Sequence, residues 1–173
     1  MNVGLLPVDS MIPNLALMRL SAWHQAQGDR VEVAFPLAAD TYDRVYRSKQ
    51  FDFTPDDTVP WPCEVISGGT GYDLTTLLTP EQDTTYPDYG IFGCTYALGR
   101  LTRGCVRRCP WCVVWQQDGT VRQVATLDTF EVRRVLRNGQ INCTGGPGWT
   151  TGTVTSQASY AAANPVTLTN VAN

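Results

Sequence analysis

The sequence predicts an α/β fold, with a mainly parallel Rossmann-like sheet and helices over residues 1–90. Three observations support this prediction: an apolar run at residues 3–8, a helix-forming segment at residues 14–27, and a second apolar run at residues 30–35. A strand, a helix and a strand within 35 residues form a βαβ unit. Such units build parallel sheets with right-handed connections.

The first strand and the helix each carry local signals. Residues 3–8, "VGLLPV", are apolar along most of their length, which is typical of a strand buried on both faces. Pro13 stands near the expected helix start, where a missing N–H costs little. The helical spacing places Leu15, Met18 and Ala22 on one face, and Gly28 supplies the C-terminal stop.

Two further strands are expected at residues 42–48 and 63–67, separated by a loop with three prolines. The segment "GGTGY" at residues 68–72 follows the second of them without the GxGxxG spacing, so a tight turn with positive φ is favoured over a ligand loop. Residues 78–90 are predicted to be a polar connector, and residues 94–102 one more strand.

Composition bears on partners and compartment. The chain has 173 residues, a net charge of −3 and a pI near 5.0, which argues against a nucleic-acid binder. No apolar stretch approaches the roughly 20 residues of a membrane helix, and the N-terminus lacks the basic region of a signal peptide. We therefore expect a cytoplasmic protein, whose thiols are kept reduced.

Charge is distributed unevenly along the chain. Every Lys, Arg, Asp and Glu lies at or before Arg137, and residues 138–173 are rich in Thr, Gly, Ala and Asn. The predicted organisation is a Rossmann-like domain at residues 1–90, a cysteine-bearing segment at 91–137, and a tail at 138–173 that is disordered or of foreign origin.

Half of the six cysteines lie in "RGCVRRCPWC", where Cys105, Cys109 and Cys112 follow a C-x3-C-x2-C spacing. A disulfide knot, a zinc site, a redox dithiol and an iron–sulfur cluster are the candidates. Thiolates are the metal-binding form, and the arginines beside the trio favour negative charge there. Adjacent-loop geometry rarely suits disulfides, and a C-x-x-C dithiol leaves Cys105 without a role.

The number of protein ligands that each metal site needs separates the zinc site from the iron–sulfur cluster. Structural zinc takes four protein ligands; Cys94, Cys143 or His24 would have to complete the set, and none has ordinary finger spacing to the trio. A four-iron cluster takes four thiolates as an electron carrier. Three thiolates leave one iron open, which suits catalysis.

The C-x3-C-x2-C spacing, with the aromatic Trp111 directly before the last cysteine, resembles the signature of the radical S-adenosylmethionine superfamily. The surrounding residues 2–137 are similar to the N-terminal half of superfamily members in which a Rossmann-like, cobalamin-binding-type domain precedes the catalytic barrel. The stretches that carry this similarity include "YDRVYRSKQF", "GGTGYDL", "YPDY" and "LTRGCVRRCPWC".

The resemblance implies that Cys105, Cys109 and Cys112 ligate three irons of a [4Fe–4S] cluster. S-adenosylmethionine would chelate the fourth iron and be cleaved to a 5′-deoxyadenosyl radical, with electrons from a donor such as a flavodoxin or ferredoxin. The cofactors carry that chemistry, and the protein positions them. The substrate would be a small molecule whose identity the sequence does not specify.

The chain also departs from the family. Little more than the first βα unit of a barrel fits before residue 138, and Gly145-Gly146-Pro147 lacks the acidic residue of the S-adenosylmethionine-binding motif. Asp9 is not followed by the histidine of a cobalamin loop. His24 is expected on the surface of the helix or partly buried in it, which argues against histidine-ligated cobalamin. Independent turnover is therefore an open question.

Two functions of other classes stay as alternatives: a non-catalytic zinc module, and a nucleotide- or partner-binding Rossmann-like domain. Cys63 and Cys94 are expected to be buried inert thiols, and Cys143 a free one.

Overall fold

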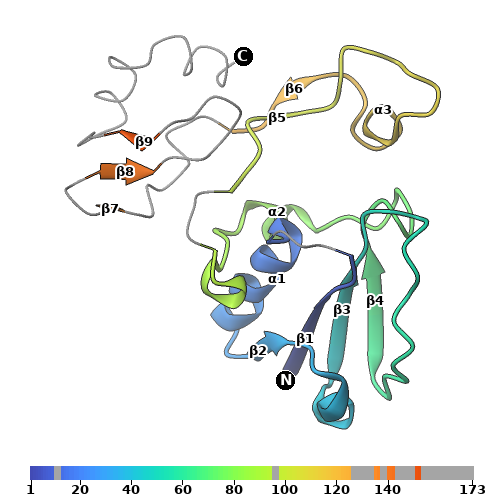
Figure 1. The fold of residues 1–173 in the computed structure, drawn as a ribbon, viewed down its shortest axis with the longest axis vertical. Coiled ribbons are helices and arrows are strands. Elements are labelled where there is room, and N and C mark those ends of the chain that lie inside the picture. Colours follow the sequence, from blue (N-terminus) through green and yellow to red (C-terminus); the bar gives the residue numbers. More distant parts are fainter. Residues whose placement is uncertain (10–12, 95–97, 126–134, 137–139, 143–150, 153–173) are drawn as a thin grey trace. The chain divides into compact units, whose positions relative to one another are not determined.

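A computed structural model describes residues 1–9, 13–94, 98–125, 135–136, 140–142 and 151–152 (Figure 1). The chain divides into two compact units, Met1–Cys94 and Thr95–Asn173. Among the described residues, no helix has both the length and the apolar character that crossing a membrane requires.

The first unit contains a four-stranded sheet in which every pair of neighbours is parallel, in the order β2-β1-β3-β4. The expected α/β fold with a parallel sheet is therefore confirmed. The strands are β1 (Asn2–Pro7), β2 (Arg30–Val33), β3 (Arg44–Ser48) and β4 (Glu64–Gly68). The chain leaves β1 toward β2 on one side and returns to β3 on the other, so the strand order reverses between β1 and β3 (Figure 1).

Helix α1 (Leu15–Ala26) connects β1 to β2, and Asn14 caps its first turn. The Asn14 Oδ1 atom accepts from the backbone N–H groups of Ala16 and Leu17, at 3.1 and 3.2 Å. The Asn14 Nδ2 atom donates to Ser48 Oγ at the end of β3, at 2.9 Å. The buried Asn14 side chain thus satisfies two backbone N–H groups of the first helical turn that have no partner within the helix. The same side chain also joins the helix to the sheet.

The buried face of α1 shares only Met18 with the face of Leu15, Met18 and Ala22 that the helical spacing predicts. Leu15 and Ala22 are only half-buried, whereas the buried stripe repeats every three or four residues from Asn14. This stripe consists of Leu17, Met18, Leu20, Ser21 and His24. The Asn14–Ser48 bond lies on this buried side of the helix. Two polar side chains of the stripe, Ser21 and His24, concealed it from the apolar pattern.

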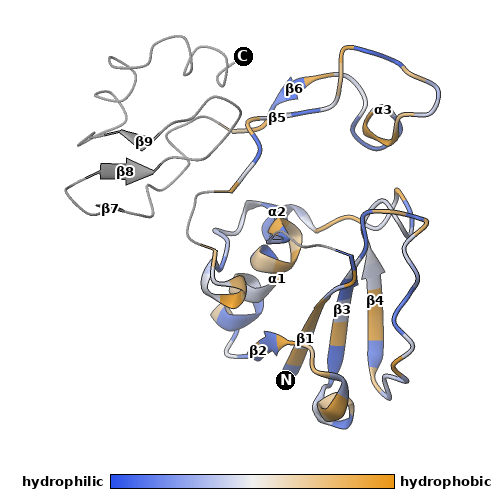
Figure 2. Ribbon diagram, viewed as in Figure 1, coloured by the Kyte–Doolittle hydropathy of each residue, from blue (hydrophilic) through white to orange (hydrophobic). Residues whose placement is uncertain are grey.

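Apolar side chains pack on both faces of the sheet. The ribbons of β1, β3 and β4 contain hydrophobic stretches (Figure 2). One cluster joins the strands to α1 and consists of Val3, Leu5, Leu17, Leu20 and Tyr46. On the other face Val45 packs with Ala34 and Tyr42, and Trp61 from the β3–β4 loop lies against them. Burial of these side chains stabilises the first unit by about 25 cal/mol for each Å² of apolar surface removed from water.

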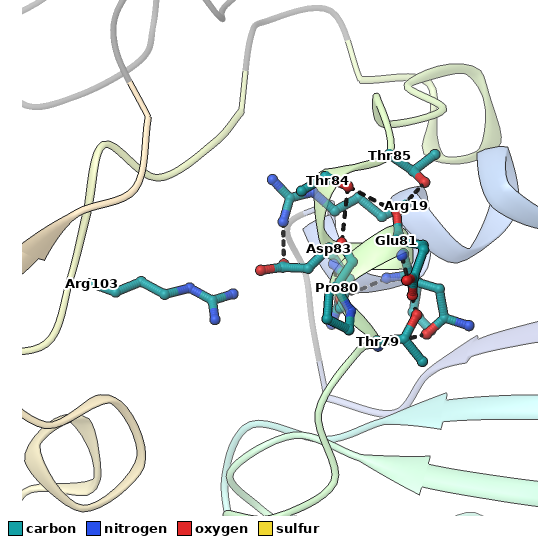
Figure 3. A network of polar contacts seen from close by, with 12 residues as sticks. Arg19, Thr79, Pro80, Glu81, Asp83, Thr84, Thr85 and Arg103 are labelled. Atoms are coloured by element: carbon teal, nitrogen blue, oxygen red, sulfur yellow. Dashed lines mark hydrogen bonds and ion pairs between the residues drawn. The ribbon is translucent and has the colours of Figure 1, made fainter.

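Residues 78–90 are more than the polar connector we expected. They contain a short helix, α2 (Pro80–Thr84), and the start of a 3₁₀ turn, η2 (Gly90–Phe92). Thr79 and Gln82 form a capping box, in which each side chain bonds the backbone N–H of the other. An ion pair between Arg19 of α1 and Asp83 joins the two helices (Figure 3). The sequence T-P-E-Q at residues 79–82 contained the signal for the capping box.

The elements in the described part of the second unit are short. Strands β5 (Thr102–Arg103) and β6 (Arg122–Gln123) pair antiparallel, and helix α3 (Val113–Asp118) lies between them in the chain. Strands β7 (Val135–Leu136), β8 (Gln140–Asn142) and β9 (Thr151–Gly152) form another antiparallel sheet. Of the strand expected at residues 94–102, the structure contains a strand residue only at Thr102, and residues 95–97 are outside the described part. The predicted disorder of residues 138–173 falls mostly on residues outside the described part.

Candidate metal centre

The three motif cysteines lie on one loop, residues 104–121, which we call the cysteine loop. Its base is closed by the β5–β6 pairing and by the Cys105 N–H, which donates to the Gly119 carbonyl at 3.1 Å. Gly104 has a φ of +81°, and a Cβ atom there would lie 2.2 Å from the Thr120 carbonyl oxygen. Only glycine fits so close to Thr120 at the other end of the loop. The sequence R-G-C therefore positions Cys105 at the closed base of the cysteine loop, which we call the neck.

The last cysteine of the motif begins helix α3. Cys112 is the N-cap residue, and its N–H donates to the Cys109 carbonyl at 3.1 Å. The Cys112 carbonyl accepts from the Gln116 N–H at 3.4 Å, which closes the first helical turn. Gly119, with a φ of +70°, ends the helix, and its N–H bonds to Trp115. Cys109 and Cys112 therefore flank one tight turn that leads into a helix.

Exposure alternates along the motif. Cys105, Cys109 and Cys112 are half-buried, whereas all five residues between them are exposed. Trp111 has 82% of its surface exposed and Val106 has 80%. We call the five exposed residues the spacer surface: Val106, Arg107, Arg108, Pro110 and Trp111. The thiols are thus set back from a cationic and apolar surface.

The surroundings of the thiols are positively charged. Between residues 95 and 125 there are five arginines and one acidic residue, whereas residues 1–94 contain thirteen acidic and five basic side chains. The Arg107 N–H donates to Cys105 Sγ at 3.4 Å. The Arg108 guanidinium lies 4.5 Å from the centre of the Trp115 ring, a cation–π contact. The Arg103 Nη1 atom lies 4.0 Å from the Asp118 Oδ1 atom. This is an environment for anionic ligands and partners.

The structure does not bring the trio together as a finished ligand set. Among the described residues, no three His, Cys, Asp or Glu side chains are grouped closely enough to hold a metal ion. Cys63 and Cys94 belong to the first unit and are half-buried rather than buried, and Cys143 lies outside the described residues. The structure thus places Cys105, Cys109 and Cys112 on one closed loop without gathering them into a ligand set.

His24 is fully buried, with 2% of its surface exposed, which corrects the expectation of a surface or partly buried position. Its Nδ1 atom lies 2.7 Å from Asp29 Oδ2 and its Nε2 atom 3.1 Å from the Tyr46 hydroxyl. Both ring nitrogens have protein partners. A metal or cobalamin at His24 would displace one of them.

The carboxyl end of the sheet is where parallel α/β folds bind ligands, at the point of strand reversal. Here Asp9, just after β1, accepts from the N–H groups of Gln50 and Phe51 at 2.7–2.9 Å. A Cβ atom on Gly69 would lie 2.3 Å from the Lys49 carbonyl oxygen, so the "GGTGY" turn packs directly on this segment. The Asp9 carboxylate thus accepts from two backbone N–H groups of the kind that bind anions in other folds. The turn with positive φ expected for residues 68–72 is confirmed at Gly69, whose φ is +97°.

A second polar cluster holds the proline-rich loop. Lys49 is buried, its Nζ atom lies 2.7 Å from Asp56 Oδ1, and it stands 4.4 Å from the centre of the Tyr72 ring. Arg47 pairs with Asp57 at 3.4 Å. Burial, together with the neighbouring Asp56 carboxylate, raises the pKa of Tyr72 to about 12. The sequence pattern did not predict this cluster, for which the adjacent Asp56 and Asp57 were the available signal.

Comparison with protein-family models, with curated proteins and with solved structures finds no match for this chain.

Proposed function

We propose that the chain binds a [4Fe–4S] cluster in the manner of radical S-adenosylmethionine proteins, with Cys105, Cys109 and Cys112 as its ligands. The observation that carries this proposal is the confinement of all three thiols to one loop with a closed base. Closure of the loop at its base limits the length of chain that must rearrange to gather the three thiols, which lowers the entropy cost of gathering them.

The donor set fits the cluster chemically. Three thiols supply three iron ligands and leave one iron for a small molecule, whereas structural zinc would need a fourth protein ligand. The half-buried positions of the cysteines allow a bound cluster to be screened from water on one side. Because the thiols are not gathered in the structure, cluster binding would draw Cys105 toward the Cys109–Cys112 turn.

When bound, the cluster with S-adenosylmethionine supplies one-electron cleavage of the sulfonium to a 5′-deoxyadenosyl radical. The contribution of this chain is to hold the cluster and to surround it with positive charge. Arg103, Arg107 and Arg108 lie in the same segment as the thiols, and a guanidinium binds carboxylates such as that of S-adenosylmethionine.

The remaining parts of the resemblance belong to the same proposal. The β2-β1-β3-β4 order is that of flavodoxin-like sheets and supports a Rossmann-like, cobalamin-binding-type assignment of residues 1–90. Residues 91–137 would correspond to the start of a radical S-adenosylmethionine barrel. A cytoplasmic location, an external electron donor and a small-molecule substrate follow from that assignment.

Anaerobic reconstitution with iron and sulfide tests the proposal. The wild-type chain should turn brown, with absorption near the ~400 nm expected of thiolate-to-iron charge transfer. Changing Cys105, Cys109 or Cys112 to Ala should abolish or strongly deplete the colour, because two thiolates hold a cluster poorly. Cys63→Ala, a half-buried thiol of the first unit, is the matched control and should leave the colour unchanged.

A colourless product would contradict the cluster. If it holds one zinc per chain, lost on changing Cys94 as readily as Cys109, the chain is a zinc module. If it holds neither metal, the nucleotide- or partner-binding alternative remains. Perturbation of the reduced cluster's electron paramagnetic resonance spectrum by S-adenosylmethionine tests the open iron separately.

A further inference from the structure

We propose that Arg47, Lys49 and Tyr72 form a binding site for the phosphoryl group of a small molecule, and that the chain's own Asp56 occupies this site in the structure. Arg47 belongs to β3, Lys49 follows that strand directly, and Tyr72 lies four residues beyond β4. We call the three residues the phosphoryl site. The inference is independent of the proposed cluster, because the phosphoryl site lies in the first unit and contains no residue of the cysteine loop.

The phosphoryl site gathers two positive charges around one aromatic ring. The Lys49 Nζ atom lies 4.4 Å and the Arg47 guanidinium carbon 5.1 Å from the centre of the Tyr72 ring. Lys49 is buried, with 6% of its surface exposed. A buried ammonium group is stable only when a negative charge and hydrogen-bond acceptors compensate for the water it has lost. This position therefore requires an anion.

Asp56 supplies the anion in the structure, and it can be exchanged. Its Oδ1 atom accepts from Lys49 Nζ at 2.7 Å, yet 45% of the Asp56 side chain is exposed. The neighbouring Asp57 is held more firmly, because it also accepts from a backbone N–H and from the Trp61 indole N–H, at 3.1 and 3.0 Å. Asp57 thus anchors the proline-rich loop, and Asp56 can leave Lys49 while the loop stays in place.

The hydroxyl group of Tyr72 identifies a missing acceptor. It is buried and has no hydrogen-bond partner among the described residues. A buried donor without an acceptor costs free energy, which a suitable ligand would recover. A phosphoryl group has three acceptor oxygens in a tetrahedral arrangement, so one oxygen can accept from Lys49 while another accepts from Tyr72. The two oxygens of the Asp56 carboxylate leave the Tyr72 hydroxyl without a partner, which favours a phosphoryl group as the ligand.

The location distinguishes this site from the point of strand reversal. Parallel α/β folds bind ligands beyond the carboxyl ends of their strands, and the strand order reverses between β1 and β3. At that point Asp9 already accepts from the backbone N–H groups of Gln50 and Phe51. The phosphoryl site lies at the next pair of strands, β3 and β4, and it uses side chains. A ligand reaches it from solvent by replacing the half-exposed Asp56.

The experiment uses inorganic phosphate as the probe and the full-length, metal-free chain. Wild type should bind one phosphate per chain at millimolar concentrations, measured by equilibrium dialysis at constant ionic strength. Asp56→Asn removes the competing carboxylate and should bind phosphate about tenfold more tightly. Phosphate should therefore raise the thermal unfolding midpoint of Asp56→Asn by more than it raises the midpoint of wild type, relative to chloride.

Glu64→Gln is the matched control. It removes the half-exposed carboxylate that pairs with Arg44 at 2.6 Å. Arg44 also lies beside a tyrosine, Tyr46, but that hydroxyl already has His24 as a partner at 3.1 Å. The control therefore combines a cation, a tyrosine and a lost carboxylate without a hydroxyl that needs an acceptor. Phosphate should shift its unfolding midpoint no more than it shifts the midpoint of wild type.

Tyr72→Phe tests the role of the hydroxyl. It should weaken phosphate binding about fivefold, both in wild type and in Asp56→Asn, because one hydrogen bond to the ligand is lost. The comparison of wild type with Tyr72→Phe also tests the site without any change at Asp56. Unaltered phosphate affinity in Tyr72→Phe would overturn the assignment of this residue to the site.

Three further results would overturn the inference. They are the lack of saturable phosphate binding to wild type, an Asp56→Asn chain that binds phosphate no more tightly than wild type, and an equal gain in Glu64→Gln. Acetate that stabilises Asp56→Asn as strongly as phosphate would overturn the assignment to a phosphoryl group. None of these measurements depends on iron or sulfide, so failure of the cluster and failure of the phosphoryl site are observed separately.

Discussion

At the scale of the residue, the buried polar side chains of the first unit are matched by specific partners. His24 places one ring nitrogen on Asp29 and the other on the Tyr46 hydroxyl, and it thereby joins α1 to β3 and to the residue before β2. A buried polar group that loses its partner costs free energy, whereas a satisfied one specifies a single packing.

We therefore expect His24→Ala to lower the free energy of unfolding by about 3 kcal/mol, because it leaves a cavity and two partners without their hydrogen bonds. Urea unfolding followed by circular dichroism measures the change. Arg30→Gln, an exposed substitution six residues away, should stay within about 0.5 kcal/mol of wild type. Equal effects of the two substitutions would show that the His24 contacts contribute nothing to stability.

Tyr72 gives a prediction for the alkaline range. Its pKa is raised from 10.0 to about 12 in the folded chain, chiefly by burial. The folded state therefore keeps the phenol proton more tightly than the unfolded state. The resulting contribution to stability is complete below pH 10 and is lost as the pH rises toward 12.

Difference absorbance at the wavelength of ionised tyrosine, wild type minus Tyr72→Phe, isolates this group. The difference should titrate near pH 12 rather than near pH 10. A midpoint at 10 would show that Tyr72 is not held against Lys49 and Asp56 as described.

At the scale of the element, short strands, one short helix and a closed loop organise residues 98–125 of the second unit. The cysteine loop is fixed by two paired residues in each strand, by Gly104 and by the six-residue helix α3. Such short elements are marginal alone. The contacts at the neck therefore decide whether the loop that carries the thiols stays closed.

Gly104→Ala tests the neck. The added Cβ atom would clash with the Thr120 carbonyl, and the positive φ would cost roughly 1–3 kcal/mol besides. We expect the Cys105 amide to lose its protection from hydrogen exchange and the reconstituted cluster content to fall by about half or more.

Gly93→Ala is the control for backbone strain alone, because Gly93 also has a positive φ and has no neighbouring atom within 4 Å of an added Cβ. It should leave Cys105 protection and cluster content unchanged. Retained protection in Gly104→Ala would mean that the two arms of the loop are not as close as described.

At the scale of the whole molecule, the first unit and the described part of the second differ in charge. The two apolar clusters of the sheet consist of residues from the first unit, and so do all four strands of the parallel sheet. The first unit is strongly acidic, while the described part of the second is basic.

A fragment ending at Cys94 should therefore unfold cooperatively by itself, with the midpoint of the full chain within about 5 °C, because no core residue of the clusters is removed. Calorimetry on the fragment and the full chain measures this. A fragment that unfolds without a cooperative transition would show that the second unit is required for the first to fold.

The sequence by itself determined the parallel sheet, and it supplied the cysteine spacing on which the proposed site rests. Apolar strands, the Gly28 stop and the C-x3-C-x2-C spacing are local signals, read within a few residues of the chain. The T-P-E-Q capping box was equally local, and α2 was therefore open to prediction.

Only the tertiary structure decided which face of α1 is buried, which N–H groups donate to the Asp9 carboxylate, and which side chains surround Lys49. Asn14 reaches Ser48, and Asp9 reaches Gln50 and Phe51, across more than thirty residues of chain. The spacing of apolar residues contains no information about such polar pairs, because their free energy depends on partners that only folding brings together. For the same reason the exposure of Trp111 and the partial burial of the cysteines around it became visible only in the folded loop.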